Sequence, residues 1–201
     1  MKNQKTNTAA GLKPLRGTFI HGKKIKLRDK KLSDVRNDYR WQSDSELAKL
    51  DAAPALNMSF TLYLLDYSSA VRERNAQRYP LAVDTIDGKH IGNCTLYDID
   101  EKRGEGQVGI MIGDKDFWNQ GYGTDVMNTF IDFIFRNTNL NRLYLKTLDW
   151  NLRAQKSFAK SGFKQCGWMQ RDGYNFLLME LYRDQWEKQQ SAAGDKGPNQ
   201  L

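Results

Sequence analysis

The stretch that decides the fold is residues 105–135, which read EGQVGIMIGDKDFWNQGYGTDVMNTFIDFIF. Its first part is apolar and predicts a strand, and its last part has the apolar spacing of a helix. The helical spacing is carried by Val126, Phe130, Phe133 and Ile134. Two glycines, Gly121 and Gly123, stand between the two parts, so the sequence predicts a strand, a glycine turn and a helix in succession.

A turn of this kind can bind an anion. Without a Cβ at Gly121 and Gly123 the main chain can approach a phosphate closely. The first turn of the following helix adds N–H groups that have no partner in the helix, together with the positive end of the helix dipole. The alternative is a turn that only joins a strand to a core helix, and two glycines alone do not separate these interpretations.

The composition is that of one soluble globular domain. The chain has 201 residues, 39% of them hydrophobic, and no apolar run reaches the 18 residues of a membrane span. The basic N-terminus lacks the apolar middle of a signal peptide, so we expect a cytoplasmic protein. Cys94 and Cys166 show no CxxC spacing and only two histidines are present, so we expect reduced core thiols and no metal site.

The net charge is +7 and the pI about 9.3, with much of the excess in residues 1–31. We interpret this segment as a solubilising basic arm, since neither zinc-finger spacing nor an aromatic RNA-binding signature accompanies it. A nucleic-acid binder stays the alternative. A polyanionic cofactor would be attracted by the same positive potential.

The order of elements predicts a mixed α+β domain. Strands are expected near residues 23–28, 79–84, 90–98, 105–112, 142–148, 163–169 and 174–182. Helices are expected near 34–44, 61–75, after Gly123, and at 152–161, where Asn151 caps the helix and Gly162 ends it. Asp87-Gly88 predicts a hairpin. Residues 43–60 are expected to be irregular.

The domain limits follow from composition. We expect a flexible basic arm at 1–16, a single domain at 17–187 and a disordered tail at 188–201. An edge strand at 174–182 could pair with a second copy in a homodimer.

Two motifs stand in register. The residues WNQGYGT at 118–124 precede the pattern Asn151-x-x-Ala154-x(7)-Gly162-Phe163 by one helix and one strand. Over residues 20 to 185 the chain therefore resembles the GNAT superfamily of acyl-CoA N-acyltransferases, and within it the RimJ/RimL branch. The resemblance implies a GNAT fold: a mixed, mostly antiparallel sheet of six to seven strands, about four flanking helices, and splayed central strands. It favours the anion-binding interpretation of the glycine turn.

The resemblance also implies acetyl-CoA as co-substrate. In the family, backbone amides of this loop bind the pyrophosphate, which here places the donors at Gln120, Gly121, Tyr122, Gly123 and Thr124. Backbone groups of Met111 and Ile112 would run beside the pantetheine arm. Asn151 resembles the family's cofactor-contacting asparagine, a role compatible with its N-cap role. Trp118, where the family often has Arg or Gln, is assigned to packing.

The proton-transfer groups depart from the family pattern. Many relatives carry Glu at the position of Gln107, and Gln cannot take a proton. Glu105 lies two residues earlier on the same strand face and is the candidate base, with a solvated hairpin carboxylate as the alternative.

Many relatives also place Tyr, the acid, at the position of Phe158. Ser157 and Tyr174 are candidate substitutes, and water is a third. A backbone N–H near Ile110 or Met111 would contact the oxyanion, as the resemblance implies.

The implied function is transfer of an acetyl group from acetyl-CoA to a primary amine by direct attack in a ternary complex. An α-amine with pKa near 8 is about a tenth neutral at pH 7, whereas a lysine-type amine is neutral less than about 0.1% of the time. A site without the usual base therefore favours a peptide or protein amino terminus, held between residues 41–60 and the hairpin near Tyr174. The alternatives are a polyamine or aminoglycoside acetyltransferase and a non-catalytic acetyl-CoA-binding module.

Overall fold

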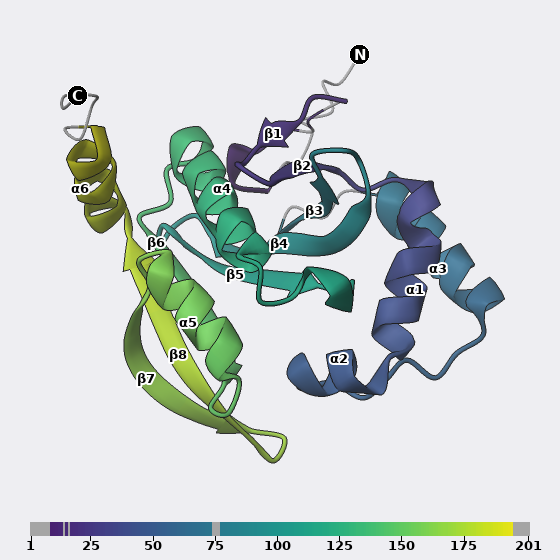
Figure 1. Cartoon of the computed structure of the whole chain (residues 1–201). Coiled ribbons are helices and arrows are strands. Elements are labelled where there is room, and N and C mark those ends of the chain that lie inside the picture. Colours follow the sequence, from purple (N-terminus) through teal and green to yellow (C-terminus); the bar gives the residue numbers. More distant parts are fainter. Residues whose placement is uncertain (1–8, 14, 16, 74–76, 195–201) are drawn as a thin grey trace.

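The computed structural model describes residues 9–13, 15, 17–73 and 77–194, and within them the strands form one eight-stranded sheet (Figure 1). The strands are β1 (Ile20–His21), β2 (Ile25–Asp29), β3 (Arg78–Thr85), β4 (His90–Asp100), β5 (Glu105–Ile112), β6 (Arg142–Leu148), β7 (Lys164–Arg171) and β8 (Tyr174–Tyr182). Their spatial order is β1-β2-β3-β4-β5-β6-β8-β7, and only the pair β5 and β6 is parallel. The predicted mixed, mostly antiparallel sheet is confirmed. It has one strand more than expected, because the two-residue β1 is too short to show a periodicity.

The described residues form six α-helices rather than about four. They are α1 (Val35–Ser43), α2 (Ser45–Leu50), α3 (Phe60–Arg72), α4 (Tyr122–Asn137), α5 (Leu152–Lys160) and α6 (Arg183–Gly194). Helix α2 lies in the segment 43–60 that was expected to be irregular. Asp44 begins it by accepting hydrogen bonds from the N–H groups of Glu46 and Leu47.

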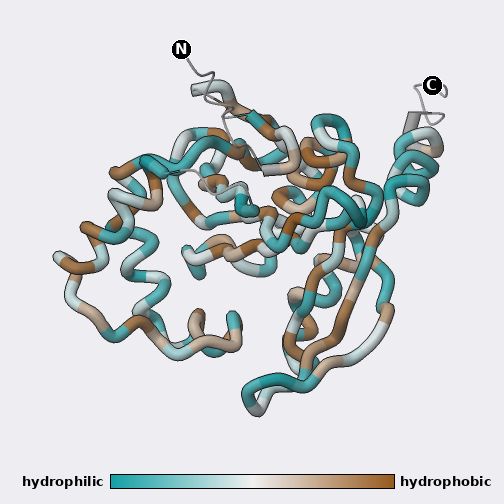
Figure 2. The backbone as a smooth tube through the Cα atoms, turned by 180° about the vertical axis from the view of Figure 1, so that it is seen from behind, coloured by the Kyte–Doolittle hydropathy of each residue, from teal (hydrophilic) through white to brown (hydrophobic). Residues whose placement is uncertain are grey.

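Helix α6 occupies residues that were expected to begin a disordered tail. Figure 2 shows why, since hydrophilic residues dominate along this helix. Its first turn is nevertheless anchored: Trp186 is 8% exposed and its ring lies 5.4 Å from the ring of Phe135. Arg183 donates to the backbone oxygens of Phe135, Thr138 and Leu140 at the end of α4. The prediction of a disordered tail from residue 188 is therefore wrong for residues 188–194. Residues 195–201 lie outside the described part.

The end of the expected N-terminal arm also packs on the domain. Leu12 is 2% exposed, and the Tyr79 hydroxyl donates to the Lys13 carbonyl over 2.7 Å. The described residues among 9–15 are thus part of the fold rather than a flexible arm. Residues 1–8, 14 and 16 lie outside the described part.

Helices α4 and α5 lie side by side across the sheet, whereas α1, α2 and α3 form a separate group on the other side of the molecule (Figure 1). The inner face of α4 supplies much of the core, and Val126, Phe130 and Ile134 are fully buried. This packing fixes the start of α4, and with it the glycine turn, relative to the strands.

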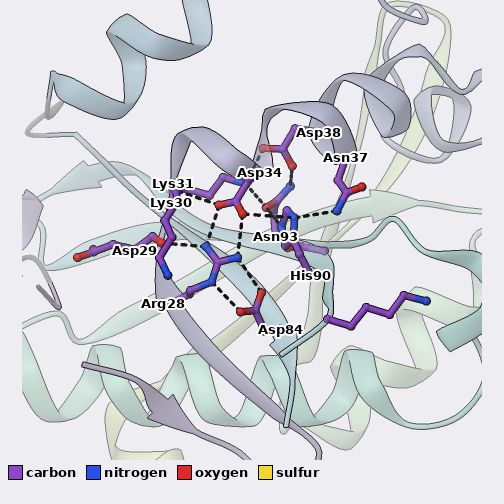
Figure 3. A network of polar contacts seen from close by, with 12 residues as sticks. Arg28, Asp29, Lys30, Lys31, Asp34, Asn37, Asp38, Asp84, His90 and Asn93 are labelled. Carbon is purple, nitrogen blue, oxygen red and sulfur yellow. Dashed lines mark hydrogen bonds and ion pairs between the residues drawn. The ribbon is translucent and has the colours of Figure 1, made fainter. Parts of the chain in front are cut away.

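A buried ionic network ties the start of α1 to the sheet (Figure 3). The guanidinium of Arg28 on β2 donates to both carboxylate oxygens of Asp34 and to both of Asp84, over 2.7–2.9 Å. Beside it, Lys30 Nζ lies 2.5 Å from Asp38 Oδ2. Arg28 and Lys30 belong to the basic segment 1–31, so part of its charge is neutralised inside the fold.

The central strands separate as the resemblance implied. β5 and β6 pair only at Glu105↔Arg142, Gly106↔Leu143 and Gln107↔Tyr144. β5 then continues to Ile112 beside β4, and β6 continues to Leu148 beside β8. The remaining halves of β5 and β6 diverge and leave an opening in the middle of the sheet.

Two expectations about the last hairpin were wrong. The strand at 174–182, β8, lies between β6 and β7 and is not an edge. A homodimer paired at this end of the sheet would use β7, and the dimer itself stays a prediction. Cys166 on β7 is exposed rather than buried, whereas Cys94 is buried as expected, and both thiols are free.

Candidate active site

Two adjoining cavities lie where β5 and β6 separate. The first, which we call the turn pocket, has a volume of about 460 Å³ and lies over the glycine turn between β5 and α5. The second, the splay groove, has a volume of about 1240 Å³ and runs from the opening in the sheet toward α1 and α3. Seven residues border both cavities: Leu50, Asp51, Ile110, Met111, Asn151, Ala154 and Phe158.

The glycine turn has the backbone shape that its sequence requires. Gly121 stands at the N-cap of α4 with φ +83°, a left-handed conformation that residues with a Cβ adopt at a cost. Asp125 in the first helical turn accepts hydrogen bonds from the N–H groups of Lys23 and Lys24, and Lys24 Nζ donates to the Gln120 carbonyl. The β1–β2 connection therefore holds the turn in place, and the first N–H groups of α4 stay free of helical partners.

The predicted cofactor residues divide into two groups. Those that border the turn pocket are Met111, Ile112, Gly121, Gly123, Thr124 and Asn151. Gln120 and Tyr122 do not border it. The side-chain amide of Gln120 donates to the Asp116 carbonyl, and the Tyr122 ring packs edge-on against the Phe117 ring, with 5.1 Å between the ring centroids. The prediction for these two concerns their backbone N–H groups and stays a prediction. Asn151 caps α5, where its side-chain oxygen accepts from the Ala154 N–H.

The register of β5 distinguishes its two predicted backbone contacts. A Cβ on Gly92 would lie 2.1 Å from the Met111 carbonyl oxygen, so this carbonyl faces β4. Because successive residues of a strand present their backbone groups to opposite sides, Ile110 and Ile112 present theirs toward the opening. Trp118 Nε1 donates to the Ile112 carbonyl over 2.7 Å, which agrees with this orientation and with a packing role for Trp118. The backbone contact with the pantetheine arm that was predicted for Met111 is therefore reassigned to Ile110 and Ile112.

Basic residues of α5 border the turn pocket and were missed by the sequence analysis. They are Arg153, Lys156 and Lys160. Their spacing of three and four residues places them on one helix face, and that spacing is the signal that could have revealed them. The Arg153 guanidinium lies 3.6 Å from the centroid of the Trp118 ring. The pocket thus combines a glycine turn, a helix N-terminus and three cations, which is a donor set suited to a phosphate-bearing ligand.

Glu105 is not placed to act as a base in this site. It lies at the far end of β5, before the strands separate, and borders neither cavity. Its carboxylate lies 2.7 Å from Arg142 Nη1 and 3.5 Å from Arg103 Nη1. Arg142 also binds Glu180, so Glu105 belongs to a partly buried ion-pair network.

Gln107 and the two acid candidates lie in three different places. Gln107 is 5% exposed and its Nε2 donates to Tyr97 Oη over 2.6 Å, so it reaches the splay groove only through Tyr97. Ser157 borders the turn pocket, where its Oγ lies 3.0 Å from Thr124 Oγ1. Tyr174 stands at the β7–β8 turn and borders neither cavity. Of the four catalytic candidates, only Ser157 lines a cavity directly.

The splay groove carries more acids than bases. Its described carboxylates are Asp29, Asp38, Asp51, Asp66 and Glu73, and its cations are Lys30, Arg78 and Lys146. Burial raises the pKa of Tyr97 to about 12, with the charges of Asp51 and Asp98 adding to the effect. The groove therefore holds neutral phenols and a carboxylate excess, which suits a cationic ligand.

No group of three or more described His, Cys, Asp or Glu side chains could hold a metal ion. No described helix is long and apolar enough to cross a membrane.

Comparison with known proteins assigns the class. Residues 24–164, more than half of the chain, match the family described as acetyltransferase (GNAT) domain. The chain therefore belongs to the GNAT acetyltransferase family, whose members use acetyl-CoA.

The similar proteins include one curated relative and two solved structures. An uncharacterized N-acetyltransferase p20 from Bacillus licheniformis is 25% identical over 150 residues, which cover 74% of this chain and 83% of the relative. Spermidine N-acetyltransferase from Vibrio cholerae, solved with CoA and spermine, has a TM-score of 0.72 at 16% identity, covering 82% and 98%. RimJ from Mycobacterium smegmatis, solved with CoA-disulfide, has a TM-score of 0.70 at 17% identity, covering 85% and 89%. At these identities the two structures show the shared fold.

Proposed function

We propose that the protein transfers an acetyl group from acetyl-CoA to a primary amine by direct attack in a ternary complex, and that a peptide or protein amino terminus is its first acceptor class. The observation that carries the proposal is the junction of the turn pocket and the splay groove where β5 and β6 separate. Two ligands that enter from opposite sides would meet there, and positioning two reactants can supply effective molarities of about 10⁵–10⁸ M.

The turn pocket has groups that fit acetyl-CoA. The N–H groups around Gly121 and Gly123 and the cations Lys156 and Lys160 would hold its phosphates. Backbone groups of Ile112 would accompany the pantetheine arm. Bound acetyl-CoA supplies a thioester carbonyl that a neutral amine can attack.

Chain groups at the junction would shape the reaction. The Ile110 N–H, on the open side of β5, would donate to the developing oxyanion. Phe158, 7% exposed and bordering both cavities, would exclude water from the junction. Ser157 and Thr124 would share one hydrogen bond beside the cofactor and orient each other.

The two acceptor classes are favoured by different observations. An α-amine is favoured because it is only weakly basic and is partly neutral at pH 7. Gln107, at the position where many relatives have Glu, cannot take a proton from a more basic amine, and its side chain is hydrogen-bonded to Tyr97. The carboxylate excess of the splay groove favours the second candidate, a polyamine or aminoglycoside that carries several positive charges.

A thiol-release assay with acetyl-CoA separates these acceptors. We would compare a peptide with a free α-amine, the same peptide N-acetylated, spermidine and kanamycin at one ionic strength. The highest kcat/KM for the free peptide supports the proposal, and a preference for spermidine or kanamycin transfers it to the second candidate. If calorimetry shows that CoA binds but no amine causes thiol release from acetyl-CoA, the protein is a non-catalytic binding module.

A further inference from the structure

Asp51 stands at the junction of the two cavities. It is the C-cap residue of α2, and among the described residues it is the one titratable side chain that borders both the turn pocket and the splay groove. The other ionisable groups of the turn pocket are the α5 cations, and the other acids of the groove border the groove alone. A carboxylate therefore lies where an acceptor amine would meet the co-substrate.

The carboxylate of Asp51 is available for a ligand. Within the described part of the chain, no hydrogen bond or ion pair joins it to another side chain, whereas Asp38 in the same groove is bound by Lys30 and Asn93. Its place at a helix C-terminus gives it no favourable helix-dipole interaction, since anions are stabilised at the opposite end. Capping therefore does not account for an acid at this position.

The surroundings of Asp51 tune its basicity. Protein atoms around the groove raise the pKa of its carboxyl by burial, although the residue is accessible from solvent, and Arg78 and Lys146 oppose the rise. Tyr97 lines the same groove, and the charge of Asp51 contributes to the raised pKa of that phenol. A carboxyl whose pKa moves toward neutrality is a stronger base at the working pH.

We infer that Asp51 is the carboxylate that receives the acceptor ammonium and takes a proton from it, in place of the base that Glu105 and Gln107 do not provide. The inference rests on the proposed function. One proton passes from the ammonium to a carboxylate oxygen of Asp51, which leaves a neutral amine. The nitrogen then bonds to the acetyl carbonyl carbon as the carbon–sulfur bond breaks. The second nitrogen proton reaches the leaving thiolate, and Asp51 returns its proton to solvent.

Tyr97 would assist as a positioning residue. Its hydroxyl oxygen accepts from Gln107, so its own proton stays available for a group in the groove. Gln107 thereby acts at the site through Tyr97 instead of replacing the missing carboxylate.

The test compares Asp51→Asn and Asp51→Glu with the wild type, with Asp184→Asn on the remote helix α6 as a matched control. We expect Asp51→Asn to lower kcat/KM by about 10²–10⁴-fold. The acidic limb of the kcat/KM–pH profile should disappear in Asp51→Asn and persist in Asp51→Glu. Asp184→Asn should match the wild type, and circular dichroism and thermal melting should show all variants folded.

Binding supplies a second readout. With CoA present, calorimetry of the best amine from the assay above should show weaker binding to Asp51→Asn, while CoA alone binds all variants equally. Wild-type kcat/KM, an unchanged acidic limb and equal amine binding in Asp51→Asn would overturn the inference and leave the proposed function standing. If the wild type releases no thiol with any amine, the proposed function fails, and the role of Asp51 as proton acceptor fails with it.

Discussion

Gln107 Nε2 donates a hydrogen bond to Tyr97 Oη over 2.6 Å, joining a buried amide of β5 to a phenol of β4 that borders the splay groove. The pair occupies the place where a general base was sought from the sequence. Its amide cannot accept a proton from an amine, but it fixes the orientation of the phenol.

Removing the phenol oxygen should destabilise the fold. Tyr97→Phe leaves the buried Gln107 amide without this acceptor, so we expect the free energy of unfolding to fall by about 1–3 kcal/mol. Gln107→Leu should cost less, because the freed Tyr97 hydroxyl can bind water in the groove. In urea titrations the double variant should lose less than the sum of the two single variants. Strict additivity would show that the bond contributes nothing.

The left-handed backbone at Gly121 should matter for cofactor binding. Gly121→Ala places a Cβ at φ +83°, which costs about 1–2 kcal/mol, and movement of the turn to relieve it would weaken CoA binding by about 5–30-fold. Gly88→Ala is the matched control, because Gly88 has φ +98° in a hairpin outside both cavities. Calorimetry with CoA should show a loss only in Gly121→Ala. Equal losses in both would assign the effect to general destabilisation.

The cations of α5 should contribute to CoA affinity through phosphate contacts. Lys156→Gln and Lys160→Gln each remove one positive charge from the turn pocket, and we expect each to weaken CoA binding by about two- to fivefold at low salt. The loss should shrink as ionic strength rises, because salt screens the same attraction between lysine and phosphate that the substitution removes. Lys164→Gln on β7 borders neither cavity and serves as control. Losses that do not depend on salt would argue against direct charge contacts.

The buried network should make stability depend on pH. Burial and the charge of Lys30 lower the pKa of His90, against the opposing charges of Asp34 and Asp38. The folded state therefore binds this proton less readily than the unfolded chain does, and stability is lost as pH falls below about 6.5. For Asp34, burial tends to raise the pKa, but hydrogen bonds from Arg28 and the Lys31 N–H outweigh it and the net pKa is lowered. Its contribution is complete above about pH 4 and is lost as pH falls through its folded pKa.

Urea titrations at pH 7.5, 6.5 and 5.5 test the histidine part. We expect the free energy of unfolding to fall toward pH 5.5 in the wild type and to fall less steeply in His90→Asn. His21→Asn, at an exposed position on β1 outside the network, is the matched control. A wild-type slope in His90→Asn would contradict this account of the network.

Local signals in the sequence predicted much of the fold. Asn151 caps α5 through its side chain, Gly162 follows the helix with φ +94°, and Gly88 turns the β3–β4 hairpin. Each of these caps and turns depends only on residues a few positions apart, so local sequence is enough to predict it. Helix α6 was missed because its anchors, Arg183 and Trp186, contact the end of α4 about 50 residues earlier in the chain.

The sequence by itself determined the strand, glycine turn and helix, because the backbone needs glycine where φ is positive and the helix needs its apolar spacing. Only the tertiary structure decided which acid lies at the junction of the two cavities. Glu105 is bound by Arg142, 37 residues later, at the closed end of the β5–β6 pair. Asp51 lies at the open end, where Lys115, about 70 residues later in the chain, forms ion pairs with Asp44 and Glu46 at the start of α2. Where two strands stop pairing, and which helix then faces the opening, depends on contacts distant in sequence, and no local pattern encodes them.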